Sequence, residues 1–459
     1  MKMFSKPDLL PAEARPLVDR ARLAQFADAL AVAVALSLPW STSATGILIG
    51  LWLVVLLPTL EFSMLRRELM APAGGLPILL WLLGALGMLW ADVSWSDRFA
   101  GLSGYHKLLL LPFVLAQFRR TGQAEWVLLA LLASCAVLLA VSFGLALVPG
   151  LPWRGNTHIG VPVKDYILQS ELFAVCAFGL LGLAAAHRRA HPRRALMLVF
   201  AALVFIANIV YVETARTTLV AMAVLLVLFG FLQFGWRGAL LACLCAALLA
   251  GAMWVSSPYL RQRVSQAVQD VQFSDQSRVV SPVGLRLEFW RKSLGFLAQA
   301  PIIGHGTGSI PELFRRDATA QTHPMAITTN PHNQVLVVAL DLGLLGTIVL
   351  LAMWLAHLKL FSRASSMARS TYSLCSLAQR GGESTEDARL TSMLAVAQTD
   401  RSQDHAVLAW FGLIIVVQNI VCSMFNSHLF DFSQGWLYVW GVGVLGGSIL
   451  HASSVPGRQ

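Results

Sequence analysis

The feature that most constrains this chain is a succession of apolar runs, most of them long enough to cross a bilayer as a helix. A transmembrane helix needs about 20 mainly apolar residues, and in lipid it must satisfy its own backbone hydrogen bonds. We therefore expect an all-α polytopic membrane protein with about 12 transmembrane helices. The expected spans lie near residues 24–40, 43–61, 76–93, 105–118, 124–148, 166–187, 195–212, 216–235, 237–256, 331–357, 405–424 and 434–452.

The composition agrees with a membrane protein. Of 459 residues, 56% are hydrophobic and 13% are charged, against about 25% charged in an ordinary soluble protein. The net charge of +10 comes from short basic clusters between apolar runs. Such clusters orient a membrane protein, whereas a nucleic-acid-binding protein gathers its basic residues on one face. We expect membrane lipids as partners and no nucleic acid.

The basic clusters predict the topology, because Lys and Arg concentrate in cytoplasmic loops. With a cytoplasmic N-terminus they fall in every second loop, at 2–22, 66–67, 119–120, 188–194 and 358–404. The prediction is an inner-membrane protein with both termini in the cytoplasm. It divides the chain into spans one to nine in 1–256, a large periplasmic loop in 257–330, and the last three spans in 331–459 with the cytoplasmic loop 358–404.

The cysteines predict neither a disulfide framework nor a metal site. All six lie in apolar runs or in the loop 358–404, and none lies in a segment assigned to the periplasm. Ligand spacings such as CxxC and HExxH, which are the local signatures of a metal site, do not occur in the sequence. We expect no metal and no cofactor.

The long periplasmic loop contains an expected helix over Arg286–Ala300, which Pro301 ends. Apolar side chains recur there with helical spacing and are mixed with basic ones, which indicates a helix lying on the bilayer surface. The glycine-rich stretch Gly304–Gly308 follows and predicts a tight turn. The apolar positions of the expected helix are Leu287, Trp290, Leu294 and Leu297.

A histidine at the start of the tenth expected span is the strongest candidate for chemistry. Asn330 as the cap and Pro331 as the first helical residue would place His332 in the first turn. Free backbone N–H groups and the helix dipole favour an anion there and keep an imidazole neutral, able to take a proton. Gly343 would lie on the same helix face, close to three turns on. The alternative is an ordinary interfacial histidine with packing glycines.

Two arginines on the outer side are candidates for binding an anion. Arg216 opens the eighth span, where orientation does not explain a positive charge, and a guanidinium matches phosphate oxygens bidentately. The alternative is contact with lipid headgroups. Arg286 opens the expected loop helix, and by position alone Arg291 and Lys292 compete with it.

Further candidates are weaker by position alone. The cluster around the start of the sixth span could bind sugar hydroxyls or phosphate, or could be a solvated loop. Asp341 would lie deep in the membrane, and we expect it to face another helix as a structural partner. The cluster comprises Arg154, His158, Lys164, Asp165, Tyr166 and Gln169, and Asn426, His428 and Asp431 lie between the last two spans.

The pattern His332-Asn333, nine residues, then Gly343-Leu-Leu-Gly346 resembles the signature of bacterial O-antigen ligases. An arginine heading a helix with Trp290, and an arginine at the mouth of a span, are similar to the wider O-antigen ligase/polymerase superfamily. The resemblance covers about residues 205–350. It implies a glycosyltransferase of GT-C-like architecture that moves a glycan from undecaprenyl pyrophosphate to the lipid A core on the periplasmic face, without metal, and with inversion.

The resemblance also implies roles for residues. Arg216 and Arg286 would hold the pyrophosphate, and His332 would act as the general base or help to hold the diphosphate. His305 and His323 lie in the same loop, so the base is not uniquely assigned. Substrate contacts are expected from Arg154, His158, Lys164, Gln169, Arg291, His305 and Asn333.

Two other functions are compatible with the sequence. An O-antigen polymerase or a protein O-oligosaccharyltransferase would use the same donor chemistry and differ in the acceptor. A multi-pass transporter or lipid flippase would also have many spans, but it would carry its charges along a midplane route. Here the candidate charges gather at the outer surface, with the exception of Asp341.

Overall fold

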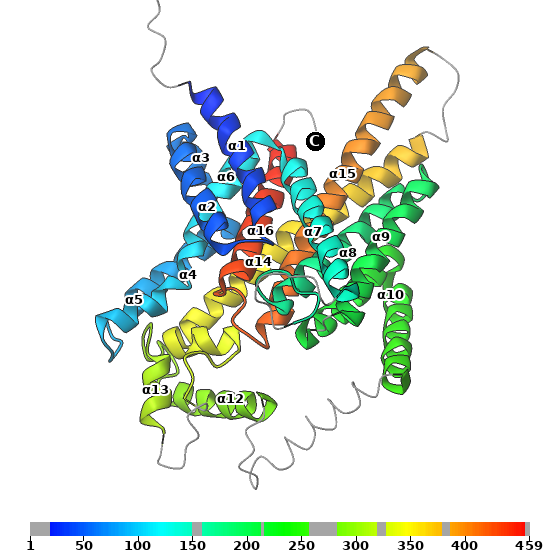
Figure 1. The fold of residues 1–459 in the computed structure, drawn as a ribbon. Coiled ribbons are helices and arrows are strands. Elements are labelled where there is room, and N and C mark those ends of the chain that lie inside the picture. The colour runs from blue at the N-terminus through cyan, green and yellow to red at the C-terminus, as the bar shows by residue number, and fades with distance from the viewer. Residues whose placement is uncertain are drawn as a thin grey trace, which may run out of the picture.

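The computed structural model describes residues 19–148, 158–212, 215–256, 282–318, 327–378 and 386–454. Within these ranges the chain forms helices and no strand (Figure 1). The helices are α1 (Arg20–Ser37), α2 (Thr42–Leu56), η1 (Leu57–Thr59), α3 (Phe62–Met70), α4 (Pro72–Gly87), α5 (Trp95–Ser103), η2 (His106–Leu110), α6 (Leu111–Thr121), α7 (Ala124–Leu147), α8 (Tyr166–His187), α9 (Pro192–Tyr211), α10 (Arg216–Ser256), α12 (Pro282–Gln299), α13 (Ile310–Arg316), α14 (Gln334–Ala378), α15 (Glu386–Ser423) and α16 (Phe432–Ser454).

The all-helical, multi-pass prediction is confirmed, but the count of twelve spans is not. In the described ranges seven helices are long and apolar enough to cross a membrane, or nine if each of two bent pairs counts as one span. The bent pairs are α3 with α4, at 81°, and α5 with η2 and α6, at 52°. The third and fourth expected spans, 76–93 and 105–118, overlap the second part of each pair, and the bends lie just before or at the expected starts.

Two long helices are broken at a glycine with positive φ. In α10, Gly235 has φ 67° and ψ −155°, and the backbones of Gly230 and Gly238 are so close that a Cβ on Gly230 would press on the Gly238 carbonyl. A straight helix would separate these residues by about 12 Å. Therefore α10 folds back at Gly235, and its halves correspond to the expected spans 216–235 and 237–256.

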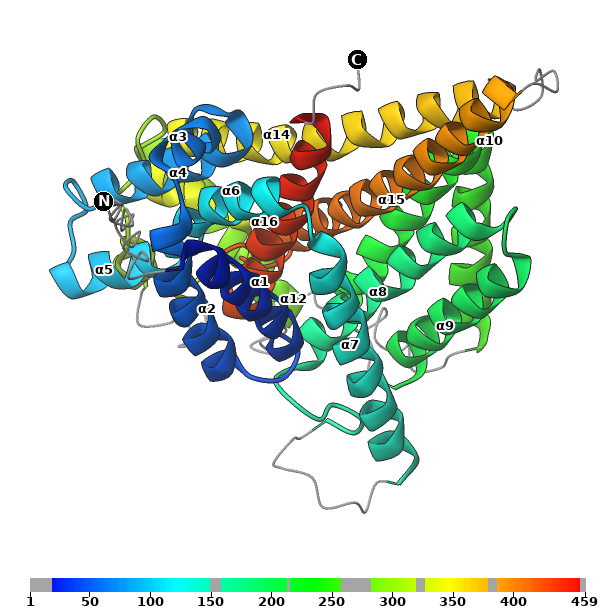
Figure 2. The same ribbon diagram turned by 90° about the horizontal axis from the view of Figure 1, so that it is seen from above.

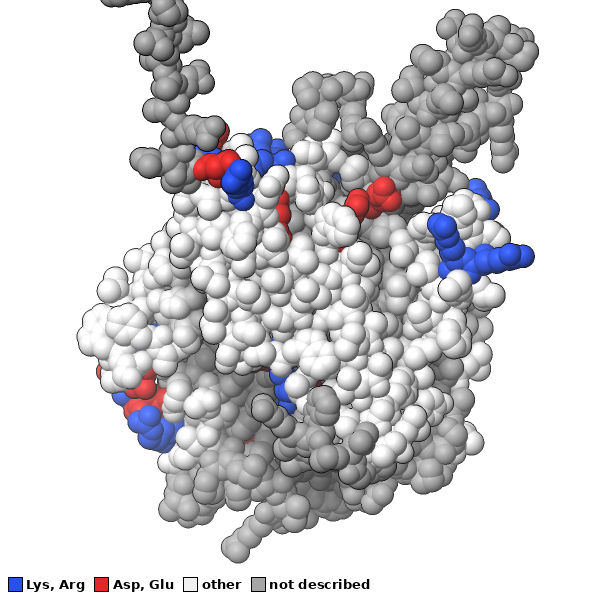
Figure 3. All heavy atoms as spheres, turned by 45° about the horizontal axis from the view of Figure 1, so that its top comes forward, with Lys and Arg blue, Asp and Glu red and all other residues white. Residues whose placement is uncertain are grey.

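The outer surface of the helical body is suited to lipid. Many large apolar side chains of α7, α9 and α10 are exposed, among them Trp126, Phe200 and Leu240. Figure 3 shows a broad face almost free of charged residues, with Lys, Arg, Asp and Glu at its rim. Scattered exposed leucines are normal on a soluble protein, but an apolar face of this extent marks a membrane or protein contact.

The two ends of the body differ. The start of α1 and the end of α16 lie at one end, and α12 and α13 lie at the opposite end (Figure 1). Figure 2 shows α3, α4 and α5 at one side of the molecule, α8, α9 and α10 at the other, and α14 and α15 side by side. The described parts of 358–404, expected to be a loop, are helical: α14 continues to Ala378 and α15 begins at Glu386.

Candidate active site

Helix α12 lies against the segment that precedes α14. Trp290 Nε1 donates to the Pro331 carbonyl at 3.1 Å, and the Phe289 ring stacks on His332 with centroids 6.1 Å apart and planes at 26°. Arg286 is three residues before Phe289 and four before Trp290, so it shares their helix face. One face of α12 therefore brings an arginine to the neighbourhood of His332.

The expected helix in the long loop is confirmed, and its large apolar side chains lie on two faces, one packed on the protein and one exposed. Phe289, Ser293 and Phe296 are buried, whereas Leu287 is 42% exposed and Leu294 is 60% exposed. The sequence carries apolar side chains on two faces, and spacing alone could not show which of them packs on the protein. The exposed leucines leave an apolar stripe of the kind that an interfacial helix inserts into a bilayer.

His332 does not lie in the first turn of the helix, as the sequence predicted. Helix α14 begins at Gln334, and Asn333 caps it, its Oδ1 accepting from Val335 N at 3.0 Å and Leu336 N at 3.2 Å. His332 precedes the cap with φ 55°, and its backbone N–H donates to Asn330 Oδ1 at 2.8 Å. The cap moves from Asn330 to Asn333 because the Asx turn at Asn330 competes with helix formation.

A chain of side chains sets the orientation of the His332 ring. His332 Nδ1 lies 3.0 Å from Asn426 Oδ1, and Asn426 Nδ2 donates to Asp431 Oδ2 at 3.1 Å. Since a carboxylate only accepts, the Asn426 amide must present its oxygen to the imidazole. His332 Nδ1 is therefore the donor, and in the neutral ring Nε2 is left as a proton acceptor.

Arg286 and Arg216 act on one another electrostatically. Burial lowers the pKa of the half-buried Arg286 guanidinium, Tyr166 opposes this, and the positive charge of Arg216 lowers that pKa further. Arg216 is exposed at the start of α10, and Tyr166 begins α8 with its ring 5.1 Å from the His158 ring. Two positive charges that repel one another beside a partly buried surface form a place for an anion.

The structure distinguishes Arg286 from its basic neighbours. Lys292 Nζ forms ion pairs with Glu288 at 3.1 Å and Asp317 at 2.8 Å, and these hydrogen-bonded carboxylates raise its pKa although burial lowers it. Arg291 is exposed. Lys292 therefore braces α12, and Arg286 is the basic residue of α12 whose pKa is lowered by the charge of Arg216.

The other expected site residues are dispersed. Gln169 Nε2 donates to Ser142 Oγ at 3.1 Å and the Gly160 carbonyl at 3.2 Å, inside the helix packing. His305 Nε2 donates to the Phe296 carbonyl at 2.8 Å, which ties the glycine-rich turn to α12 and occupies that nitrogen. Lys164 Nζ donates to the Leu38 carbonyl and to Ser433 Oγ at 2.9 Å. Arg154 and His323 lie outside the described residues.

The glycine-rich turn is built into the break in α14. Gly343, expected on one continuous face with His332, instead has φ 61° and interrupts the helix. The break leaves backbone groups unpaired, and residues 301–306 satisfy them: His305 N donates to the Leu340 carbonyl at 2.7 Å, and Leu344 N donates to the Pro301 carbonyl at 2.8 Å. The two glycine motifs therefore form one structural unit beneath the site.

Asp341 lies on the short helix between Asn333 and this break. Tyr105 donates to its Oδ2 at 3.1 Å, and Gly308 N donates to its Oδ1 at 3.3 Å. Beside it opens a cavity of about 500 Å³, whose polar lining includes Asn330 and Asp431, both of which hold the His332 network. A cavity that joins the network of His332 offers room for a sugar-sized molecule.

A family model described as O-antigen ligase matches residues 201–351. This stretch is therefore similar to proteins of the O-antigen ligase/polymerase superfamily. It contains Arg216, Arg286, His332 and Gly343, the residues that the sequence pattern indicated. Proteins of the O-antigen ligase family are membrane glycosyltransferase-like enzymes. No curated protein matches the chain.

Several residues that contact or influence the candidate site lie outside the matched range 201–351. Asn426 and Asp431 belong to the loop between α15 and α16, and Tyr166 belongs to α8. The sequence had marked these three only as weak candidates. Phe289, which stacks on His332, carried no signal beyond its spacing of three from Arg286, and only the folded arrangement reveals its contact.

Proposed function

We propose that this protein transfers O-antigen polysaccharide from undecaprenyl pyrophosphate to the lipid A core, at an active site on the periplasmic side. The observation that supports this most is the placement of Arg286 on the face of α12 that also packs on His332. A charge pair for a diphosphate and a proton acceptor for a hydroxyl are what glycosyl transfer from a pyrophosphate donor requires.

The arginines would stabilise the leaving group. As the bond between the anomeric carbon and the phosphate oxygen breaks, negative charge develops on the pyrophosphate, and Arg216 and Arg286 would meet it with bidentate hydrogen bonds. The repulsion between the two guanidinium groups is relieved when the anion binds. The donor end of the reaction is therefore supported by residues of this chain alone.

His332 would act as the general base. Its Nδ1 is held by Asn426, so Nε2 would take the proton from the acceptor hydroxyl as the hydroxyl oxygen attacks the anomeric carbon. One displacement of this kind inverts the configuration. In His305 the Nε2 atom donates to the Phe296 carbonyl, so Nδ1 would be its proton acceptor, and His305 is the alternative base.

The test is transfer by purified protein, given a carrier-linked glycan and a lipid A core acceptor. We expect His332→Ala to reduce the transfer rate by about 10²–10⁴-fold and Arg286→Ala by about 10²–10³-fold. Arg291→Ala is the matched control on α12 and should retain the wild-type rate. Wild-type transfer by His332→Ala would contradict the assignment of the base.

A polymerase differs from a ligase in its products and not in its donor site. In cells lacking this protein, a ligase leaves full-length polymer on its lipid carrier, whereas a polymerase leaves single repeat units on the lipid A core. Full-length unligated polymer is the expected result. Single-repeat capping would instead assign the protein as the polymerase.

A further inference from the structure

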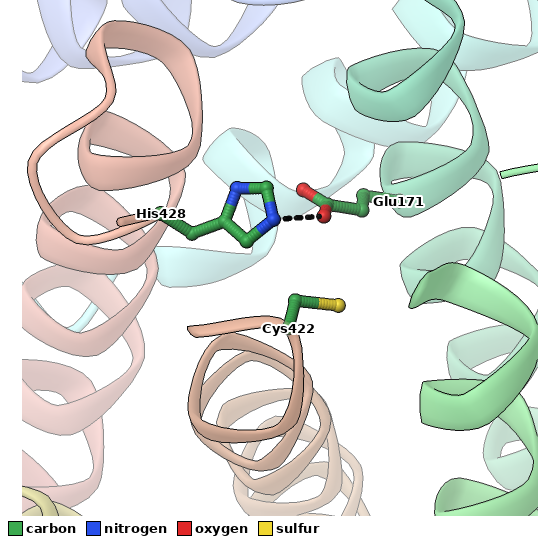
Figure 4. A group of neighbouring side chains, drawn as sticks. All are labelled: Glu171, Cys422 and His428. Atoms are coloured by element: carbon green, nitrogen blue, oxygen red, sulfur yellow. Dashed lines mark ion pairs between the residues drawn. The ribbon is translucent and has the colours of Figure 1, made fainter. Parts of the chain in front are cut away.

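A group of three buried side chains lies at the junction of α8, α15 and residues 424–431. Glu171, Cys422 and His428 each present one potential ligand atom, and the three atoms lie within 4.8 Å of one another. Their residues are 3%, 1% and 1% exposed. Figure 4 shows the carboxylate, the thiol and the imidazole converging from separate segments of the chain.

The three groups are the ligand types that zinc takes in proteins: carboxylate oxygen, thiolate sulfur and imidazole nitrogen. His428 Nε2 lies 3.2 Å from Glu171 Oε1. Two ligands that each lie about 2.0 Å from a tetrahedral ion are about 3.3 Å apart. The spacing of the pair therefore suits one edge of a tetrahedral site, and neither atom has a hydrogen-bond partner among the described residues.

Unpartnered amide oxygens stand beside the group. Gln418 Oε1 and Asn419 Oδ1 lack hydrogen-bond partners among the described residues, and these residues are 4% and 7% exposed. With Glu171, Cys422 and His428 they line a cavity of about 10 Å³, room for about one water molecule. An amide oxygen or a water can complete a fourfold coordination.

The outer contact of His428 is also of the kind found in metal sites. Its Nδ1 lies 3.3 Å from Asp431 Oδ2, so a carboxylate faces the ring nitrogen that points away from the group. A metal-bound histidine usually has its second nitrogen paired with a carboxylate or carbonyl, which orients the ring. In the absence of an ion, the two carboxylates instead favour an imidazolium between them.

We propose that Glu171, Cys422 and His428 bind a divalent cation of the zinc type, which fastens α8 to α15 and to the loop 424–431. Binding displaces the thiol proton of Cys422 and any proton on His428, and both protons go to solvent. Asn426, which holds His332, belongs to this loop. The ion would thus hold the loop beside the active site in place, and it would take no part in the transfer reaction.

The experiment measures metal content in full-length protein purified in detergent without chelator. Elemental analysis by inductively coupled plasma mass spectrometry should find about one zinc ion per chain in the wild type. The zinc should be lost in Cys422→Ser. Cys176→Ser is the matched control, because Cys176 is an equally buried thiol on α8 outside the group. It should retain the metal.

A second experiment, absorption spectroscopy of a cobalt-substituted protein, reports on the ligands directly and does not depend on transferase activity. Protein stripped by chelator and refilled with Co²⁺ should show tetrahedral d–d bands and a thiolate-to-cobalt charge-transfer band. Cys422→Asp should keep the d–d bands and lose the charge-transfer band, since an oxygen ligand replaces sulfur. If stripped wild-type protein binds neither Zn²⁺ nor Co²⁺ above the level of Cys422→Ser, the group is a buried acid–base network and the proposal is wrong.

Discussion

At the scale of single residues, the site depends on partners that are distant in sequence. His332 stood out from its local pattern, but the residue that orients its ring, Asn426, is 94 positions away. Arg286 was one of three basic residues on α12, and the ion pairs of Lys292 and the exposure of Arg291 separate it from the other two. Residue type and position identified the candidates, and contacts made in the folded chain support the roles proposed for them.

Lys164 allows a prediction about pH. Burial lowers the pKa of its ammonium to about 8 from 10.5, although Asp165 raises it. The folded protein therefore binds fewer protons than the unfolded chain between about pH 8 and about pH 10.5, so stability rises with pH in that window. Below about pH 8 the cost of burying the charge is complete.

The measurement compares thermal unfolding of wild type and Lys164→Met in detergent. The substitution keeps the length of the side chain and removes its titration. The melting temperature of wild type relative to Lys164→Met should rise as the pH increases from about 8 to about 10. Two curves that stay parallel across this range would show that the Lys164 ammonium is not the group responsible.

At the scale of elements, the break in α14 explains why two glycine motifs occur on either side of His332. The N-terminal segment of α14 ends at Gly343, and residues 301–306 supply the missing backbone partners. A Cβ on Gly304 would lie 2.6 Å from the Asp341 carbonyl carbon, and one on Gly343 would collide with the Ile302 carbonyl. Both positions therefore need glycine for close approach as well as for φ.

Replacement of Gly343 by alanine tests this unit. Gly343 has φ 61° and ψ −155°, a backbone conformation that only glycine adopts readily, so alanine there should cost about 1–3 kcal/mol. The collision with Ile302 adds to that cost. We expect Gly343→Ala to lower the melting temperature and to reduce transfer. Gly295→Ala is the control, since nothing lies within 4 Å of a Cβ there and alanine favours a helix. Equal melting temperatures for the two variants would contradict the role of the break.

At the scale of the whole molecule, the proposed site lies at the end opposite the start of α1 and the end of α16. Helices α12 and α13 occupy that end (Figure 1). The uncharged face between the two ends suits the bilayer (Figure 3). This arrangement supports the prediction that the termini are cytoplasmic and that the active site is periplasmic.

Thiol labelling tests that orientation. Arg316 near the end of α13 is 57% exposed, and Arg22 near the start of α1 is 87% exposed. A membrane-impermeant thiol reagent, applied to cells with a permeabilised outer membrane, should label Arg316→Cys and not Arg22→Cys. Both should react after lysis, which is the control for accessibility. Selective labelling of position 22 would invert the topology.

Much of the architecture could be predicted from the sequence, because a helix that spans a bilayer must be apolar over about 20 residues. Apolar length predicted the helices, and the helix near 286–300 was found at Pro282–Gln299. The bends at α3–α4 and α5–α6 and the helical extension of α14 to Ala378 were not foreseen. Bends depend on how a helix packs against other helices, and the apolar composition of a segment does not predict that packing.

By itself, the sequence predicted a helical membrane protein and indicated a resemblance to O-antigen ligases, and it singled out Arg216, Arg286 and His332. Those inferences rest on hydrophobic length and on short motifs, which are local properties. Only the tertiary structure decided that His332 lies outside the helix, that Asn426 holds it, and that Glu171, Cys422 and His428 meet. Such contacts join segments far apart along the chain, and no local pattern specifies them before the helices pack.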